Sequence, residues 1–303
     1  MKKPNFFIVG APKCGTTSMC EYLESHPDVF ISTIKEPFFF CDDVPNNKLT
    51  PTMERYLELF EGANENHVAV GEGTTLYLYS PAAIDNIRAF DPNAKIIVML
   101  RNPKHMVVSL HQQWVRALFE DERDFKKAWN LQSERSKGKS IPKHCRAPEW
   151  ILYGNMGSYA SYIERILKTF PADNVKVIIF DDFCDNTEKV FNETLEFLGL
   201  RRIDKKSFPV INSQKDFSSG FTQYIAQSTP AWVRNMVTRI RFSNHFNWIA
   251  KLLDFIFITT AKKRFTYKDI QDNDFKNELS DYFKNDIERL SIILNRNLND
   301  IWK

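Results

Sequence analysis

Short apolar runs alternate with amphipathic stretches over the first 200 residues of the chain. A short apolar run bounded by turn residues is typical of a buried strand, and apolar positions three or four residues apart are typical of a helix. The runs that predict strands are 6–9, 29–31, 67–72, 95–100 and 175–180. Strands that alternate with helices in this way predict an α/β fold, with a central parallel sheet flanked by helices.

The predicted helices begin at recognisable capping residues. Thr50-Pro51 and Ser80-Pro81 each place a hydroxyl at the N-cap and a proline at the first helical position. The helices expected in the core cover 17–25, 51–60, 81–90, 103–118, 157–170 and 186–198. Most of them join successive strands, as the crossover connections of a parallel sheet must.

Two regions depart from this alternation. The charged segment from about 119 to 156 is expected to be an insertion over the core. Residues 201–303 are predicted to be a mostly helical extension that includes an amphipathic helix over 275–294. Because no repeat or low-complexity linker separates these regions from the 5–200 core, we predict a single domain over residues 1–303.

Charge and hydropathy exclude two classes of partner. The 41 basic residues exceed the 38 acidic ones by only three, which is too little for a general nucleic-acid binder. The most apolar late run, 248–261, is interrupted by Lys251 and Asp254 and is too short to span a bilayer. We therefore expect no nucleic-acid partner and no transmembrane segment, and leave peripheral membrane contact open.

The cysteines and the N-terminus predict a cytoplasmic protein. The five cysteines are odd in number and lack Cys-x-x-Cys spacing, which favours free thiols in a reducing compartment and argues against zinc. Residues 1–4 lead directly into the first predicted strand, with no room for a signal peptide.

The stretch 5–18 (NFFIVGAPKCGTTS) predicts a strand, a tight loop and the start of a helix. Backbone N–H groups converge at such a helix start, where the helix dipole is positive, and phosphate is the usual ligand. The spacing of Gly10 and Gly15 matches the nucleoside triphosphatase loop, but Thr16 stands where the lysine of that motif belongs. The lysine here is Lys13, inside the loop, so we expect a phosphate cradle without the usual triphosphatase chemistry.

A second anion site is predicted at the end of the most apolar strand. Arg101 follows that strand directly, and Ser109 lies about two turns into the next helix. A guanidinium fork with a hydroxyl suits a terminal phosphate, and ligands of parallel sheets bind at the carboxyl ends of the strands. Together with the Lys13 loop, this predicts a ligand with two separated phosphate groups.

These motifs resemble those of the sulfotransferases that use 3′-phosphoadenosine 5′-phosphosulfate (PAPS) as donor. Residues 12–18 fit the Pro-Lys-x-Gly-Thr-Thr/Ser-x form of the donor loop, and Arg101 followed eight residues later by Ser109 fits the 3′-phosphate site. Gly-Ser-Tyr at 157–159 and Phe-Leu-Gly-Leu at 197–200 also agree. The resemblance implies the P-loop-like sulfotransferase fold.

Within that superfamily the chain is most similar to the heparan-sulfate-type and bacterial branch. That branch carries Lys-Glu-x-x-Phe-Phe after the first helix, matched by residues 35–40, and a segment like the one at 71–77. The Lys-Thr-His and Arg-Lys-Gly segments of the hormone-sulfating branch are absent from the sequence. Lys215 is our candidate to replace the second of these at the adenine end of the donor.

The resemblance also implies roles for individual residues. Lys13 would stabilise the charge that develops on the leaving phosphate, and Glu36 would be the base, because relatives with this motif use that glutamate. Glu72, at the end of its own strand, is the second candidate for the base. The expected product is adenosine 3′,5′-bisphosphate, with no metal required. The residues expected to bind the donor are Lys13, Cys14, Gly15, Thr16, Thr17, Ser18, Arg101, Ser109 and Tyr159.

Two other functions stay open at the level of sequence. A nucleotide kinase or triphosphatase with a degenerate loop would need a magnesium-binding aspartate, for which Asp181 and Asp182 are the candidates. A catalytically silent nucleotide-binding protein would keep the donor site while Glu36 and Glu72 were dispensable.

The sequence leaves the acceptor and the oligomeric state undetermined. The apolar and aromatic residues of the helical segment expected at 217–265, among them Trp232 and Trp248, fit a glycolipid or a small hydrophobic acceptor, and equally fit packed helices or a self-association surface. A set of basic residues fits an acidic glycan, and equally fits a solvated basic surface: Arg116, Arg123, Lys126, Lys127, Arg135, Lys137 and Lys139.

Overall fold

The computed structural model describes residues 2–43, 50–205, 207–209 and 265–302. Within them lies a five-stranded sheet of order β2-β3-β1-β4-β5, in which every pairing is parallel. The predicted parallel sheet is therefore confirmed, and the strands predicted at 29–31 and 95–100 have the bounds expected. The strands are β1 Phe6–Gly10, β2 Val29–Ile31, β3 Ala69–Gly73, β4 Lys95–Leu100 and β5 Val175–Ile179.

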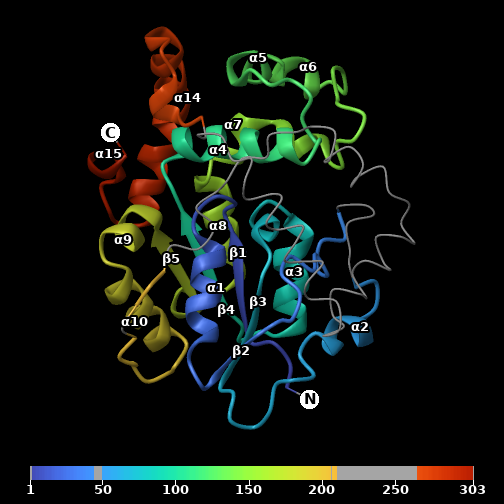
Figure 1. Cartoon of the computed structure of the whole chain (residues 1–303), viewed down its shortest axis with the longest axis vertical. Helices are drawn as coiled ribbons and strands as arrows, with labels where there is room; N and C mark the ends of the chain where they lie inside the picture. The colour runs from blue at the N-terminus through green and yellow to red at the C-terminus, as the bar shows by residue number, and fades with distance from the viewer. Residues whose placement is uncertain (1, 44–49, 206, 210–264, 303) are drawn as a thin grey trace, which may run out of the picture.

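Helices cover both faces of the sheet. Helices α1 and α10 contact each other on one face, and α3 and α8 contact each other on the other face (Figure 1). This arrangement explains why β1 and β4 are apolar over nearly their whole length, since neither face of these strands meets water. The helices of the core are α1 Thr16–Glu24, α2 Met53–Glu58, α3 Pro81–Phe90, α4 Pro103–Arg116, α8 Ala160–Thr169, α9 Phe180–Asp185 and α10 Thr187–Phe197.

The structure corrects several predicted boundaries, among them the strand expected at 67–72, which is Ala69–Gly73. The N-cap of α2 is Thr52, whose hydroxyl accepts a hydrogen bond from Arg55 N at 3.3 Å, and not Thr50. The helix expected at 157–170 begins only at Ala160, because Gly157 ends the preceding helix α7 and the chain leaves helical geometry at Ser158. The final predicted strand ends one residue early, at Ile179, and the chain continues directly into α9.

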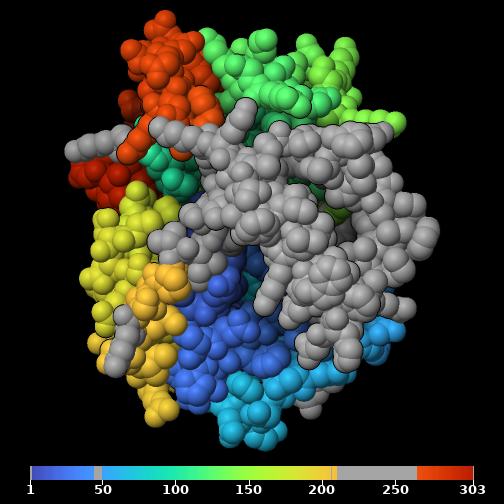
Figure 2. Space-filling model, in the orientation of Figure 1, coloured from blue at the N-terminus to red at the C-terminus, as the bar shows by residue number. Residues whose placement is uncertain are grey.

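The insertion at 119–156 packs against the C-terminal helix. It contains α5 Phe125–Asn130, α6 Gln132–Arg135, the 3₁₀ turn η2 Pro148–Ile151 and α7 Tyr153–Gly157, and it faces α14 Asn273–Ile293. The indole N–H of Trp129 donates to Glu278 at 2.9 Å, and its ring lies 6.4 Å from that of Phe275. Figure 2 shows the insertion (green) and α14 (red) side by side above the blue N-terminal residues.

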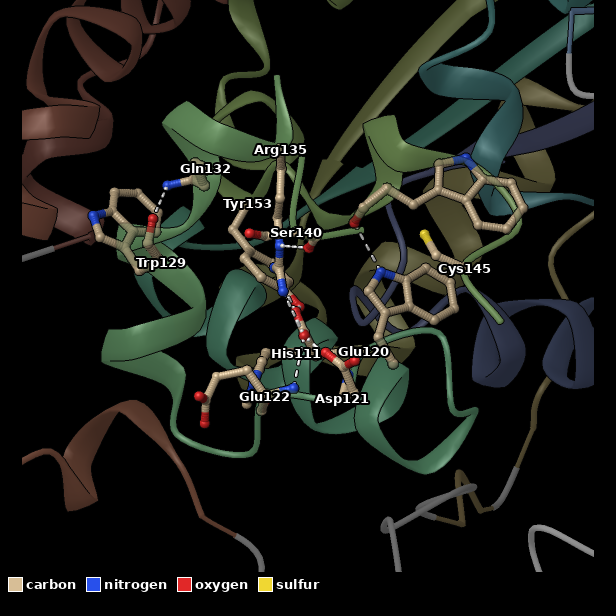
Figure 3. Close-up of polar contacts among 12 residues, drawn as sticks. His111, Glu120, Asp121, Glu122, Trp129, Gln132, Arg135, Ser140, Cys145 and Tyr153 are labelled. Atoms are coloured by element: carbon tan, nitrogen blue, oxygen red, sulfur yellow. Dashed lines mark hydrogen bonds and ion pairs between the residues drawn. The ribbon is translucent and has the colours of Figure 1, made fainter. Parts of the chain in front are cut away.

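A buried ion pair holds the insertion together (Figure 3). The guanidinium of Arg135 donates to both carboxylate oxygens of Glu120, at 2.6 and 2.7 Å, and both side chains are fully buried. The Tyr153 hydroxyl donates to the same carboxylate at 2.8 Å. Two backbone N–H groups, from Asp121 and Glu122, donate to it at 3.0 Å. The insertion thus has a polar centre in which each carboxylate oxygen is satisfied.

The last described residues close against the sheet edge. After the short helix α15 Leu298–Ile301, the indole N–H of Trp302 donates to Asp181 at 3.0 Å. The Asn102 amide donates to the Trp302 carbonyl at 3.0 Å. The end of the chain is therefore fixed to the residues that follow β4 and β5.

Several predictions concern residues outside the part of the chain that the structure describes. Lys215, the aromatic residues 232–248 and all but the last residue of the 217–265 segment are outside them, so the single domain over 1–303 stays a prediction. All five cysteines are described, and each is a free thiol. No helix in the described part of the chain has both the length and the hydropathy to cross a bilayer.

Candidate active site

The loop after β1 has the geometry of an anion cradle. At Gly10 a Cβ would lie 2.7 Å from the Thr75 carbonyl oxygen, so only glycine permits this close approach. Lys13 and Gly15 both take left-handed φ values, 65° and 84°. Gly15 is the N-cap of α1, and no side chain among the described residues caps that helix start. A helix start without a side-chain cap can offer its N–H groups to a ligand or water.

The remaining predicted loop residues lie in and just before the first turn of α1. Thr16 is buried, whereas Thr17 and Ser18 are half-buried. The Cys14 thiol is buried and donates to the Pro12 carbonyl at 3.4 Å. Burial raises the pKa of Cys14 to about 12, while the positive charges of Arg101 and Lys13 act in the opposite direction. Cys14 therefore stays a neutral thiol between the two cations.

The loop and Arg101 lie at one edge of the sheet because β1 pairs with β4. Ala11 N donates to the Met99 carbonyl at 2.7 Å just past the end of this pairing. The Arg101 guanidinium lies 4.9 Å from the centre of the Phe180 ring. A Cβ on Gly15 would lie 3.0 Å from the same ring. The Phe180 ring therefore lies next to a residue of each predicted phosphate site.

A pocket of about 390 Å³ opens beside Arg101. Its wall includes His105 from α4, Phe180 and Cys184 from α9, and Ile301 from α15. Burial, followed by the charges of Arg101, Lys104 and Lys268, lowers the pKa of His105 to about 4. At neutral pH His105 is therefore uncharged, and Arg101 is the cation that lines this pocket among the described residues.

Ser109 and Tyr159, the other two residues expected to bind the donor, are both buried. Ser109 is buried in α4, about two turns after Arg101. Tyr159 is fully buried, and its hydroxyl has no hydrogen-bond partner within the described residues. Burial raises the pKa of Tyr159 well above its usual value, although the positive charge of Arg101 acts in the opposite direction. An unsatisfied buried hydroxyl at this position is a polar group that a ligand could satisfy.

Glu36 is held beside the loop by contacts with Thr75 and Lys35. Its carboxylate accepts hydrogen bonds from the Thr75 N–H and the Thr75 hydroxyl, each at 3.0 Å. Lys35 Nζ lies 3.9 Å from Glu36 Oε1 and donates to the Thr17 hydroxyl in the first turn of α1. Burial raises the pKa of Glu36 above its ordinary value of 4.5, against the lowering effects of Lys35 and Thr75. Glu36 is thus a partly exposed carboxylate tied to the donor loop.

Glu72, the second candidate for the base, is enclosed. It has no exposed surface and accepts hydrogen bonds from the hydroxyls of Tyr56 and Tyr77, both at 2.9 Å, and of Thr74, at 2.6 Å. Burial raises its pKa to about 7. Since no atom of Glu72 is available to an acceptor, this geometry favours a structural role.

Replacement of Glu72 by glutamine should change how stability depends on pH. A folded-state pKa near 7, above the ordinary 4.5, means that the folded state favours protonated Glu72. The associated stability is full below pH 4.5 and is lost as the pH rises through 7. Relative to Glu72→Gln, the wild type should lose about 2–3 kcal/mol of unfolding free energy between pH 5 and pH 8. Urea unfolding at the two pH values measures this, and parallel behaviour of the two proteins would contradict it.

Two contributors were missed by the sequence analysis. Thr75, which holds Glu36, lies within the 71–77 segment that had been singled out, but without an assigned role. Phe180 directly follows β5, and the rule that ligands bind at the carboxyl ends of strands points to its position. No group of three metal-ligating side chains lies close enough to hold an ion in the described residues.

A glycine-bracketed loop after β1 and an arginine after β4 are the features expected of an α/β protein that binds phosphate groups. Residues 3–207 match the family described as Sulfotransferase domain, and the chain belongs to that family. The predicted P-loop-like sulfotransferase fold is confirmed by a solved relative, the sulfotransferase from Alicyclobacillus acidocaldarius. It is 26% identical, with a TM-score of 0.68 over 99% of each chain.

Curated relatives include enzymes named for carbohydrate acceptors. Human carbohydrate sulfotransferase 15 is 24% identical over 265 residues, covering 67% of this chain and 45% of its own length. Human heparan sulfate glucosamine 3-O-sulfotransferase 6 is 25% identical over 216 residues, covering 71% of this chain and 57% of its own length. The chain thus spans about half the length of these curated relatives.

Proposed function

We propose that the protein transfers the sulfuryl group of PAPS to a hydroxyl or amine of an acceptor and releases adenosine 3′,5′-bisphosphate. The observation that carries this proposal is the arrangement at the carboxyl edge of the sheet. There the uncapped start of α1, Arg101 and the Lys35–Glu36 pair meet. Family membership supports the same activity.

Two cations hold the two ends of the donor in this proposal. Lys13 and the first N–H groups of α1 would bind the 5′-phosphosulfate, and Arg101 with Ser109 would bind the 3′-phosphate. The Tyr159 hydroxyl, unsatisfied among the described residues, would gain a partner in the bound donor. Phe180 lies next to both Arg101 and Gly15, so the two phosphate sites would hold opposite ends of one nucleotide on either side of its ring.

Glu36 takes the acceptor proton in the proposed reaction. The acceptor oxygen or nitrogen forms a bond to sulfur while the bond from sulfur to the phosphate oxygen breaks in line with it. The electron pair of the broken bond stays on the 5′-phosphate, where Lys13 and the start of α1 stabilise it. Because these groups supply the positive charge, the proposal requires no metal ion.

We propose a glycan as the acceptor. This rests on the relatives named for carbohydrate and heparan sulfate acceptors. The basic set from the sequence is smaller than expected, because Arg135 is fully buried against Glu120 and Lys126 pairs with Asp272 at 2.6 Å. Lys137 and Lys139 are exposed on the insertion and are the better candidates for contact with an acidic glycan.

The kinase alternative finds little support in the site. Both candidate magnesium ligands are engaged, since Asp181 accepts from the Trp302 indole and Asp182 pairs with Arg296. Thr16 stands where the motif lysine belongs. If the protein bound the nucleotide without catalysing transfer, the donor site would be the same and only turnover would be absent.

Thermal stabilisation by nucleotides tests the proposal. Adenosine 3′,5′-bisphosphate at 100 times its Kd should stabilise the protein by about 2.7 kcal/mol without magnesium, because it binds only the folded state. AMP and ATP-magnesium should do much less, since neither carries a 3′-phosphate for Arg101. The measurement is the shift in Tm with each ligand, followed by transfer of radiolabelled sulfur from PAPS to a panel of glycans. Stabilisation by ATP-magnesium alone would instead support the kinase reading, and donor binding without transfer to any acceptor would support the silent one.

A further inference from the structure

Lys35 occupies the junction of three parts of the site. Its ammonium donates to the Thr17 hydroxyl in α1 and lies 3.9 Å from Glu36 Oε1. Its aliphatic stem passes the end of β3, where a Cβ on Gly73 would come within 4.0 Å of Lys35 Cε. The side chain is 36% exposed, so its amine lies at the surface of the site. The donor helix, the base and the central sheet therefore meet at one side chain.

We propose that Lys35 is a positioning residue for the reaction: it holds Glu36 as an anion and fixes that carboxylate relative to the start of α1. This inference rests on the proposed function, since it assigns Glu36 as the base. Lys35 acts through Glu36 and Thr17, and no contact with the acceptor is required of it.

The charges around Glu36 favour one oxygen for the acceptor proton. Oε1 accepts from the Thr75 hydroxyl, and Oε2 accepts from the Thr75 N–H, so each oxygen keeps one lone pair. Because Oε1 lies 3.9 Å from the Lys35 ammonium, its charge is the better stabilised, and we expect the proton on Oε2. Once Oε2 is protonated, Lys35 retains its charge beside Thr17, at the end of α1 where the leaving phosphate becomes more negative.

Among the titratable groups around Glu36, Lys35 has the strongest influence on its ionisation. Lys35 is the cation that acts on Glu36 within the described residues, and it lowers the pKa that burial raises. The other titratable groups are Glu72 on β3 and the thiols of Cys20 and Cys41. Burial raises the pKa of both thiols to about 12, so neither carries charge at neutral pH. Loss of Lys35 must therefore raise the pKa of Glu36.

The test compares Lys35→Met and Lys35→Arg with Lys168→Met, an exposed lysine on α8. The first readout is the pH titration of the Glu36 carboxyl carbon by ¹³C NMR in the ligand-free protein, assigned with Glu36→Gln. Lys35→Met should move the midpoint up by about one pH unit, as expected for loss of an opposite charge at this distance. Lys35→Arg should keep most of the wild-type value, and Lys168→Met should equal it.

The second readout is the pH profile of kcat. The acid limb of Lys35→Met should move with the carboxyl midpoint, so that kcat falls about tenfold at a pH below it. An unchanged carboxyl titration would overturn the proposal, as would a shifted titration with an unchanged kcat profile. If the wild type transferred no sulfuryl group from PAPS, the proposed function would fail, and the NMR titration would still decide whether Lys35 controls Glu36.

Discussion

Replacement of Lys13 by alanine should lower kcat for sulfuryl transfer by about 10²–10³-fold. The reason is that Lys13 meets a charge that grows on the leaving phosphate during transfer, so its loss affects the transition state more than the bound nucleotide. The Kd of adenosine 3′,5′-bisphosphate should therefore change much less than kcat. Single-turnover transfer rates and isothermal titration measure the two quantities separately.

The matched control is Lys168→Ala, which removes an exposed lysine from α8. It should leave both kcat and the Kd unchanged. If Lys13→Ala weakened nucleotide binding and transfer by the same factor, Lys13 would be a binding residue with no special role in the transition state.

Replacement of Arg135 by methionine should destabilise the protein by about 3–5 kcal/mol. The variant leaves the Glu120 carboxylate fully buried without its cation, although Tyr153 and two backbone N–H groups still donate to it. Burial raises the pKa of Glu120, and the hydrogen bonds from Arg135 help to hold it below its usual value, so loss of Arg135 should raise the pKa of this carboxyl. Urea unfolding at pH 7 measures the loss.

Two further variants define the cause. Addition of Glu120→Gln to Arg135→Met should recover part of the stability, because a neutral amide oxygen still accepts from Tyr153. Arg202→Met removes the exposed partner of Glu196 and should have little effect. Equal losses from Arg202→Met and Arg135→Met would show that burial of the Glu120 pair contributes nothing.

The fold was predictable where the signal is local. The strand bounds of β2 and β4 match the prediction because each strand is a short apolar run between turn residues. Ser80 caps α3 as expected, with a proline at the first helical position, whereas the same signal at Thr50-Pro51 lies two residues before the actual N-cap, Thr52. The break at Ser158 was not predictable, because Asp286, 126 residues or more away in sequence, accepts the N–H groups that start α8. Strand order likewise depends on contacts between distant segments.

The candidate site was likewise predictable where the signal is local, and not where it depends on contacts between distant segments. The Lys13 loop and Arg101 each follow a strand and were identified from their own neighbours in sequence. The enclosure of Glu72 was not visible, because it results from Tyr56 on α2 and Tyr77 on the turn after β3. The bond between Lys35 and Thr17 also joins segments that sequence alone does not bring together. Local patterns thus led to the candidate cradle, and tertiary contacts set the ionisation of the two carboxylates, Glu36 and Glu72.

Because β3 and β1 are paired in the sheet, the groups proposed to react lie on elements separate from the 119–156 segment. Thr75, just after β3, orients Glu36, and the cradle follows β1, so the reacting groups are mounted on two strands bonded in the middle of the sheet. The 119–156 segment enters from α4 and carries its own charged centre. Exchange of that segment with the corresponding one of another sulfotransferase would leave both of these strands unchanged, and it is the experiment that would test whether the segment determines acceptor selectivity.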